Sequence, residues 1–377
     1  MGRRLVVVCI VSVLSLPIVG AAPAGAQVCD GSLTAAAQPS VLNGGPSVVG
    51  SSVKAGRWAL GQRTEFGDVI KQWAVSERWD GTRWVKVQMA NAAAFEPKSM
   101  VVFGDRVWVA GRRSDPATEG GDAGSEIERW NGSAWRRALS VPAVMHARST
   151  SVWAIGGSSR HDIWAGGATV VNDAWRMVML HWDGATWTRV PAPLPLPVDA
   201  FDGDFRLNAI AASAPDDAWA VGYAFPFGQQ SFAMHWDGSA WSAVNPTVTD
   251  APTNNSLFDV AAVDSEVWAV GKADGAALLL RWGGSGWVRM PNPATGFTTN
   301  EIDTVSIGAA ILIAGYGYSG FPPNPSLEYY RWSPPDTWVE LSAPVGSIGD
   351  LSQGAGGLIL AAGGNLGESS HVFDGCL

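Results

Sequence analysis

The chain repeats one unit of four short segments, and this repetition constrains its fold more than any other feature. The clearest copy runs from Asn208 to Pro246 and reads NAIAASAPDDAWAVGYAFPFGQQSFAMHWDGSAWSAVNP. Its four apolar segments are separated by turn residues, a pattern typical of four β-strands joined by tight turns. Such units recurring every 45 to 56 residues predict a β-propeller, in which neighbouring sheets bury each other's faces.

Tryptophan marks three positions of the unit. The expected second strand carries Trp58, Trp108, Trp164, Trp219 and Trp268, and then Ile313 and Leu360 in the last two units. The expected hairpin between the third and fourth strands carries the pairs Trp79 and Trp84, Trp130 and Trp135, Trp182 and Trp187, Trp236 and Trp241, Trp282 and Trp287, and Trp332 and Trp338. Seventeen of the 20 Trp lie at these positions, so we expect them to fill the wedge between sheets rather than to form a sugar-binding ladder.

The hairpin also carries an Asp-Gly or Asn-Gly pair in most units. These pairs predict type I′ turns, in which both central residues need positive φ.

The two ends of the chain complement each other. The segment CDGSLTAAAQP from Cys29 aligns with WDGSAWSAVNP from Trp236, whereas the last unit, residues 348–377, has only three expected strands. We therefore predict that residues 30–38 form the missing outer strand of that last unit. The predicted fold is all-β, with residues 27–377 forming one seven-bladed propeller of four-stranded antiparallel blades. Cys29 and Cys376 would then lie at the same hairpin level, where a disulfide can form.

Residues 1–26 have the layout of a secretory signal peptide. MGRR is followed by the apolar run LVVVCIVSVLSLPIV and by the small residues AGA. A membrane anchor is the alternative, but the run is short for about 30 Å of hydrocarbon. We expect a secreted, monomeric protein with no membrane insertion after cleavage. The mature chain would carry 23 basic and 34 acidic residues, a net charge of −11 that argues against nucleic acid as a partner.

The repeats resemble those of exported bacterial kelch-like β-propeller proteins with DxWAVG…HWDGxxWxxVPxP units. The matching stretches include DIWAGG…MLHWDGATWTRVPAP and DDAWAVG…AMHWDGSAWSAVNP. The resemblance covers nearly all of residues 27–377. It implies a propeller architecture but little about function, because most such proteins have no assigned activity.

No catalytic constellation stands out from the repeats. A copper site of the galactose oxidase kind needs a Tyr-Cys crosslink, but both Cys that remain after cleavage are expected to form the disulfide. The segment WDGATW lacks the spacing of a sialidase Asp-box. His181 and His235 occupy the same repeat position, which indicates a structural role. Asp199, Asp202 and Asp204 are weak calcium candidates, although a solvated acidic loop is the simpler interpretation. We predict no catalytic residue, no metal site and no cofactor.

Variable segments gather on one face of the predicted disc, where the second-to-third loops and the blade connections lie. They carry aromatic residues that no repeat position requires: Trp175, Phe201, Phe205, Tyr223, Phe225, Phe227, Tyr316, Tyr318 and Phe321. We predict that this face is a non-catalytic binding site for an extracellular glycan or protein. In the alternative, these aromatics pack over the bases of their own loops.

An exported hydrolase, lyase or oxidoreductase that acts on glycans in the central channel is the other function we consider. A channel mouth lined by non-repeating Asp, Glu, His or Arg would favour the enzyme. A mouth lined by Ala, Gly and Ser would favour the binding scaffold, and inner segments such as NAIAAS favour the scaffold.

Overall fold

A computed structural model describes most of the chain after residue 28. The described residues are 29–36, 38, 46–65, 71–115, 121–142, 150–172, 174–196, 205–225, 229–247, 254–293, 299–319, 324–335, 337–343, 347–364 and 371–377. The predicted signal peptide lies outside them. Among them, no helix is long and apolar enough to cross a membrane.

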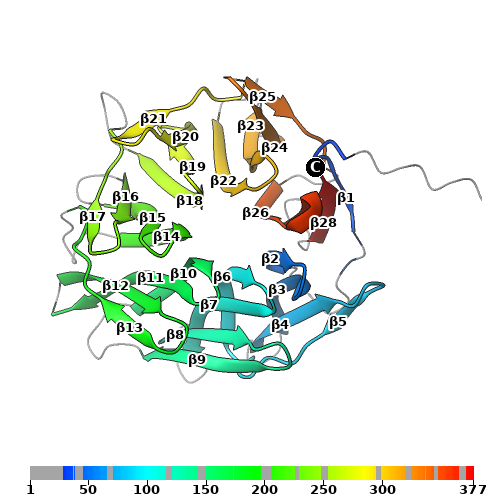
Figure 1. Ribbon diagram of the computed structural model, residues 1–377, viewed down its shortest axis with the longest axis vertical. Helices are drawn as coiled ribbons and strands as arrows, with labels where there is room; N and C mark the ends of the chain where they lie inside the picture. Colours follow the sequence, from blue (N-terminus) through cyan, green and yellow to red (C-terminus); the bar gives the residue numbers. More distant parts are fainter. Residues whose placement is uncertain are drawn as a thin grey trace, which may run out of the picture.

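The described strands form seven four-stranded antiparallel sheets arranged as blades around a central axis (Figure 1). Blades 1 to 6 are β2–β5, β6–β9, β10–β13, β14–β17, β18–β21 and β22–β25 in chain order, and blade 7 combines β26–β28 with β1. This is the predicted fold. A 3-10 turn, η1 (Ala355–Gly357), precedes β27.

Within each blade the strands follow one another from the axis outward. The inner strands are β2 (Pro46–Ser52), β6 (Phe95–Phe103), β10 (Thr150–Ser159), β14 (Phe205–Ala214), β18 (Asn255–Val263), β22 (Thr299–Ile307) and β26 (Ser347–Gln353). The second strands are β3 (Gly56–Glu65), β7 (Arg106–Asp115), β11 (Asp162–Val171), β15 (Asp217–Ala224), β19 (Glu266–Ala273), β23 (Ile311–Ser319) and β27 (Leu358–Gly364).

The third and outer strands complete the blades. The third strands are β4 (Lys71–Trp79), β8 (Gly121–Trp130), β12 (Ala174–Trp182), β16 (Gln230–Trp236), β20 (Ala276–Trp282), β24 (Asn324–Ser333) and β28 (His371–Cys376). The outer strands are β5 (Trp84–Lys86), β9 (Trp135–Pro142), β13 (Trp187–Val190), β17 (Trp241–Ala243), β21 (Trp287–Arg289), β25 (Thr337–Glu340) and β1 (Leu33–Ala35).

Strand β1 closes the ring, as the alignment of the two chain ends predicts. Leu33, Thr34 and Ala35 pair with Gly375, Asp374 and Phe373 of β28. A disulfide joins Cys29 to Cys376 across 347 residues of sequence. The strand is shorter than the predicted 30–38, so the disulfide supplements a closure that has only three ladder pairs.

The repeated Trp residues fill the wedges between blades, as expected. The ring of Trp58 in blade 1 lies 5.1 Å from that of Trp130 and 5.5 Å from that of Trp135 in blade 2. The same three-Trp cluster recurs between the next blades around Trp108, Trp164, Trp219 and Trp268. These five second-strand Trp side chains are almost fully buried, so each contributes to the hydrophobic core between its own blade and the blade that follows.

The predicted type I′ turns are not formed. Trp79 pairs with Trp84, which leaves four residues in the turn, and only Gly81 among them has positive φ. The Asp80 carboxylate accepts hydrogen bonds from the backbone N–H groups of Thr82 and Arg83. These bonds hold the pKa of Asp80 down at about 2. The Asp or Asn therefore caps a longer turn through its side chain instead of adopting positive φ.

A bulge in each inner strand explains the glycine that ends the Ala-Val-Gly segment of the second strand. In blade 4 the register with β15 shifts between Leu207 and Ala209, so Asn208 is the extra residue. The shift brings the Arg206 carbonyl oxygen against Gly222, where a Cβ would overlap it. Glycines at the same position in five other blades face an inner-strand carbonyl in the same way: Gly111, Gly167, Gly271, Gly315 and Gly363.

Candidate functional site: the channel mouth

The bulge gives each blade one inner-strand residue that does not pair, and these seven residues differ in chemistry. They are Ser47, Lys98, Trp153, Asn208, Phe258, Asp303 and Gly349. All except Trp153 line a central cavity of about 340 Å³. Because bulges commonly re-aim side chains at functional sites, we take this ring of residues, the bulge ring, as the candidate site.

Two aromatic residues of the bulge ring lie beneath lysines. The Lys98 ammonium is 5.8 Å from the ring centroid of Trp153, and the Lys272 ammonium is 5.5 Å from that of Phe258. Each lysine also contacts a glutamate, because Lys98 Nζ is 2.6 Å from Glu96 and Lys272 Nζ is 3.0 Å from Glu301. Half-buried rings with charged neighbours are typical of sites that bind amphipathic ligands.

These residues lie toward the loop-rich face of the disc. Inner strands begin, and second strands end, on the side where blade connections and second-to-third loops lie, and the bulge falls near the start of each inner strand. The sequence predicts that the variable residues lie in the loops of this face, whereas the residues gathered here belong to the inner strands.

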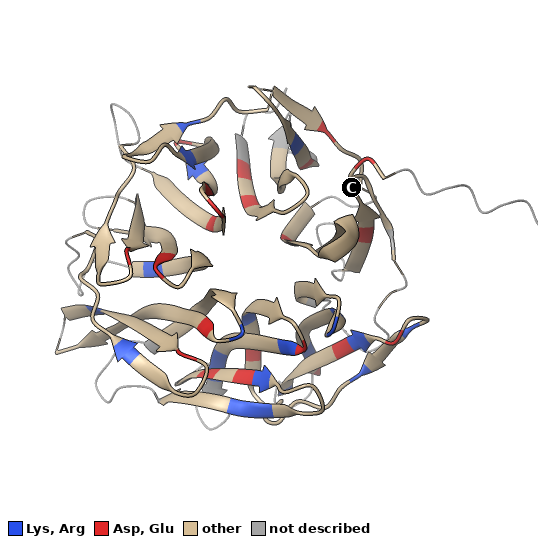
Figure 2. Ribbon diagram, viewed as in Figure 1, with Lys and Arg blue, Asp and Glu red and all other residues tan. Residues whose placement is uncertain are grey.

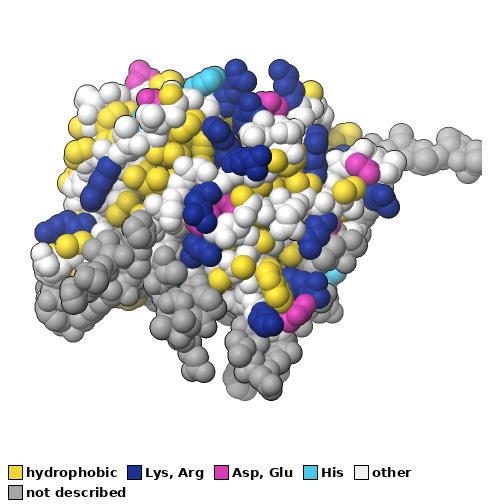
Figure 3. All heavy atoms as spheres, turned by 90° about the horizontal axis from the view of Figure 1, so that it is seen from below, with side chains coloured by type: hydrophobic (Ala, Val, Ile, Leu, Met, Phe, Trp, Pro, Cys, Tyr) yellow, Lys and Arg dark blue, Asp and Glu magenta, His cyan; other side chains and the backbone are white. Residues whose placement is uncertain are grey.

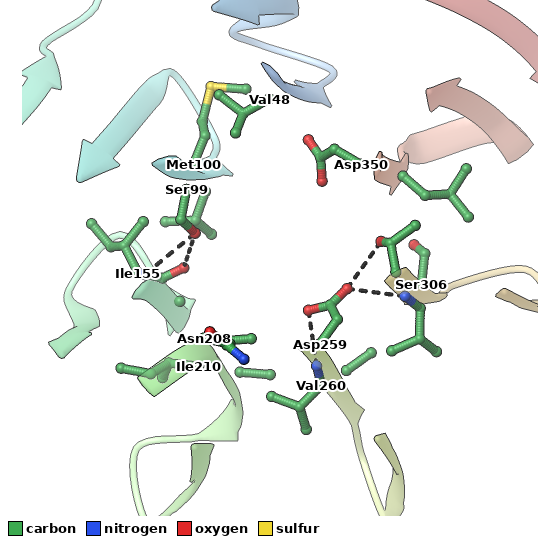
Figure 4. A pocket seen from close by; sticks show the side chains of 18 of the residues that line it. Val48, Ser99, Met100, Ile155, Asn208, Ile210, Asp259, Val260, Ser306 and Asp350 are labelled. Atoms are coloured by element: carbon green, nitrogen blue, oxygen red, sulfur yellow. Dashed lines mark hydrogen bonds between the residues drawn. The ribbon is translucent and has the colours of Figure 1, made fainter. Parts of the chain in front are cut away.

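Carboxylates cluster in the channel half formed by blades 5 to 7. Figure 4 shows the side chains of Asp259 and Asp350 pointing into the channel. Asp259 accepts hydrogen bonds from Thr304 Oγ1 and the Val305 N–H of blade 6, both at 2.9 Å. Asp350 accepts one from the Val49 N–H of blade 1 at 2.6 Å. These two acids therefore tie adjacent blades together, and burial raises their pKa values to about 6 and about 7.

Asp303 is the third carboxylate and belongs to the bulge ring. Burial, and next the charge of Glu301, raise its pKa to about 7, while Lys272 opposes the rise. Its carboxyl group changes charge near neutral pH, so it can give or take a proton there. Among the described residues, no group of three or more His, Cys, Asp or Glu could hold a metal ion.

The raised pKa of Asp303 predicts a pH-dependent stability. A carboxyl group with a folded pKa above its unfolded value stabilises the fold fully only below the unfolded pKa, here 3.8, and that contribution is lost as pH rises from there through the folded pKa of about 7. We expect Asp303→Asn to leave the urea midpoint unchanged only below the ordinary aspartate pKa of 3.8 and to raise stability at pH 8 by about 1 kcal/mol, a value reduced for screening by channel water. Equal midpoints of variant and parent at pH 8 would contradict this assignment.

The aromatic residues predicted from the loops differ in their burial and contacts. Trp175 is only 6% exposed and packs on Phe205, with ring centroids 6.0 Å apart, so its ring presents no face to a ligand. Tyr223 is half-buried, 6.0 Å below the Arg206 guanidinium and edge-on to Phe225 at 5.8 Å. Tyr316 pairs with Glu301 across β22 and β23. This places Tyr223 and Tyr316 beside the bulge ring.

The structure does not test the remaining predicted residues. Tyr318 lies in β23. Phe201, Phe227, Phe321 and the calcium candidates Asp199, Asp202 and Asp204 lie outside the described residues.

None of the seven residues of the bulge ring was predicted from the sequence. They occupy the second column of the aligned inner segments PSVV, PKSM, VWAI, LNAI, LFDV, IDTV and IGDL, and Trp153 is also one of three Trp outside the repeat positions. Their column varies, whereas the column before it holds only Pro, Val, Leu and Ile. This contrast between the two columns is the sequence signal that marks the bulge ring.

The two repeat histidines have the structural role predicted for them. His181 Nε2 lies 2.6 Å from Asp162 Oδ1, and its ring stacks on Trp164 at 4.3 Å. His235 repeats both contacts, with Asp217 at 2.7 Å and Trp219 at 4.2 Å. Both pairs lie on the hairpin-turn face, opposite the bulge ring.

Comparisons with known proteins support the fold. No family model and no curated protein matches the sequence. The chain is similar to the crystal structure of RRP9 WD40 repeats, with a TM-score of 0.57, 11% identity, and coverage of 92% of this chain and 100% of that one. It is also similar to the WD40 β-propeller domain of Doa1, with a TM-score of 0.53, 9% identity, and coverage of 90% and 96%. At these identities the likeness shows only that the fold is a β-propeller, so the function has to be inferred from the candidate site.

Proposed function

We propose that this protein is an exported, non-catalytic binding propeller that takes a saccharide unit of an extracellular glycan at the channel mouth. The bulge ring carries the proposal, because seven equivalent positions hold seven different residues, six of which line one cavity. The disulfide between Cys29 and Cys376 supports export, since such bonds persist in oxidising compartments. Kinship with exported bacterial kelch-like propellers is part of the same proposal.

The chemistry of the ring suits a sugar. Phe258 offers an apolar face in the cavity, and Trp153 offers one next to it, beneath Lys98. Asn208, Ser47 and Asp303 offer hydrogen-bonding groups. The cavity of about 340 Å³ lies within the size range of small-molecule sites. A sugar ring has an apolar face and a polar edge, so it can use both kinds of group at once.

A glycan array followed by calorimetry tests the proposal. We expect Trp153→Ala and Phe258→Ala each to weaken binding about tenfold or more, because each removes an apolar contact face. Val53→Ala serves as the control, since Val53 is 83% exposed in the turn after β2, at the opposite end of the inner strand. Unchanged affinity in both aromatic variants would place the ligand elsewhere, and selective capture of a protein would replace the glycan as ligand.

A polysaccharide hydrolase is the second candidate, and Asp303 is the observation that favours it. A carboxyl group with a pKa of about 7 next to Glu301 provides the acid and the carboxylate that glycoside hydrolysis uses. Turnover of a glycan that binds to the array, abolished by Asp303→Asn without loss of binding, would establish the enzyme and remove the non-catalytic assignment.

A further inference from the structure

The hairpin-turn face carries a repeated arrangement in which one acceptor serves two donors, the indole of the second-strand Trp and a basic side chain of the third strand. In blade 5, Glu266 Oε2 accepts hydrogen bonds from Trp268 Nε1 at 3.2 Å and Arg281 Nε at 3.0 Å. In blade 4, Asp217 Oδ1 bonds Trp219 Nε1 at 2.9 Å and His235 at 2.7 Å.

Blades 1 and 3 also provide an acceptor at this position. In blade 1 the Ala55 carbonyl accepts from both Trp58 Nε1 and Arg78 Nε. In blade 3, Asp162 bonds His181, although Trp164 Nε1 has no hydrogen-bond partner among the described residues. Each of these blades therefore supplies an acceptor for the basic side chain of its third strand.

Blade 2 breaks the arrangement. Arg106 stands two residues before Trp108, where blades 3 to 5 have Asp or Glu. Among the described residues, the buried Trp108 Nε1 and Arg129 Nε then have no hydrogen-bond partner. Desolvation, and next the charge of Arg106, lower the pKa of Arg129. Two donors that share a carboxylate in blade 5 thus lack an acceptor here.

A cavity of about 230 Å³ opens at this place, between blades 2 and 3. Its lining is Arg106, Trp108, Arg129, Arg160, His161, Trp182 and Gly184. Trp108 and Trp182 cover the Arg129 guanidinium at 5.0 and 5.3 Å from their centroids, which leaves its N–H edge for a ligand. Asp105 contacts Arg106 at 3.3 Å and Arg160 at 4.0 Å, which are two of the three guanidinium groups in the cavity lining.

The charge of the whole ring favours an anion on the same side. Residues 46–190, which form blades 1 to 3, carry 18 basic and 14 acidic residues, whereas residues 191–377 carry five and 19. Figure 2 shows most Lys and Arg in blades 1 to 3, and Figure 3 shows many basic and few acidic side chains on their outer edge. A negatively charged polymer would be drawn to this edge despite the acidic net charge.

We propose that the cavity between blades 2 and 3 binds the carboxylate or sulfate group of an acidic saccharide, in the place that the Glu266 carboxylate fills in blade 5. The oxyanion accepts hydrogen bonds from Arg129 Nε and Trp108 Nε1 and neutralises Arg106. Arg160, exposed on the next blade, contacts the same ligand from the outside. This site is separate from the channel mouth and stands whether or not a saccharide binds there.

Calorimetry with glucuronate, an oligouronate and sulfate, each at matched low ionic strength with glucose as the neutral comparison, tests the proposal. We expect saturable binding of the anions, no binding of glucose, and a shift of the Trp108 indole N–H resonance on titration. Tighter binding of the uronates would identify a carboxylate site, and tighter binding of sulfate would identify a sulfate site. No saturable binding of any of the three anions would overturn the proposal.

Arg106→Glu is the decisive variant, because it recreates the arrangement of blade 5 and supplies the missing carboxylate internally. We expect it to fold with unchanged or higher thermal stability and to lose anion affinity at least tenfold. Arg136→Glu makes the same charge change at an exposed residue of β9 outside the cavity and should retain most of the affinity. Arg160→Gln, also exposed, should weaken binding several-fold without affecting folding. Parental affinity in both Arg106→Glu and Arg160→Gln would exclude this cavity as the site.

Discussion

Replacing Cys29 and Cys376 by Ser should lower the free energy of unfolding by about 5 kcal/mol. The bond closes a loop of 347 residues, and the chain-entropy model assigns its largest effects to loops of this length. The native contacts at the closure come from a short segment. Strand β1 has three residues, and the segment that contains it adds the hydrogen bonds from Gly31 N to Cys376 O and from Leu33 N to Ser342 O and two bonds between Gln38 and Val372. Without the disulfide, we expect β1 to detach first and blade 7 to lose its outer strand.

Urea unfolding of the oxidised protein and the double variant measures this loss. The oxidised protein in excess reductant should approach the variant, whereas reductant should leave the variant itself unchanged. Hydrogen exchange should show earlier loss of protection in β28 than in the central blades. A difference below about 1 kcal/mol would mean that the three ladder pairs suffice to seal the ring.

Substituting Ala for Gly222 should destabilise the protein by about 3 kcal/mol. A Cβ at this position would overlap the Arg206 carbonyl oxygen and crowd the Phe232 ring. A flexible side chain could move aside, but the carbonyl belongs to the bulge of β14, so relief requires a change in the inner strand. Overpacking of a rigid site costs about 1 to 3 kcal/mol, and this site lies at the upper end because backbone must move.

Gly349→Ala is the matched control for Gly222→Ala. Gly349 is also on the channel side of a blade, but nothing lies within 4 Å of its Cβ position and its φ is ordinary. We expect its urea midpoint to stay within experimental error of the parent. If Gly222→Ala also left the urea midpoint unchanged, the bulge would not explain the glycine of the Ala-Val-Gly segment.

The sequence predicts the architecture well because the relevant signals are local and repeated. Trp219 and the pair Trp236 and Trp241 recur with their flanking residues, so one unit defines the others. The missing strand of the last unit and the matching segment after Cys29 then predict the closure. None of these inferences requires knowledge of which way an individual side chain points.

Prediction fails where a local backbone irregularity decides the outcome. Strict alternation along β10 does not show that Trp153 is the unpaired residue of a bulge, because the register shift between Val152 and Ala154 depends on the neighbouring strand. The turn type at the Asp-Gly pair after Trp79 is equally hard to predict, since the side chain of Asp80 selects a four-residue turn. Trp175 has a loop-like context but is buried, which its sequence neighbours do not reveal.

The direction of the Trp packing has a consequence for how such a protein can change in evolution. An open array of repeats can gain or lose a unit at modest cost, because its terminal units already face solvent. Here each second-strand Trp inserts into the following blade, and the last blade contains residues from both ends of the chain. Duplicating or deleting a single unit would change the curvature of the whole circle, so blade number is inherited as a fixed quantity while the residues of the bulge ring remain free to diversify.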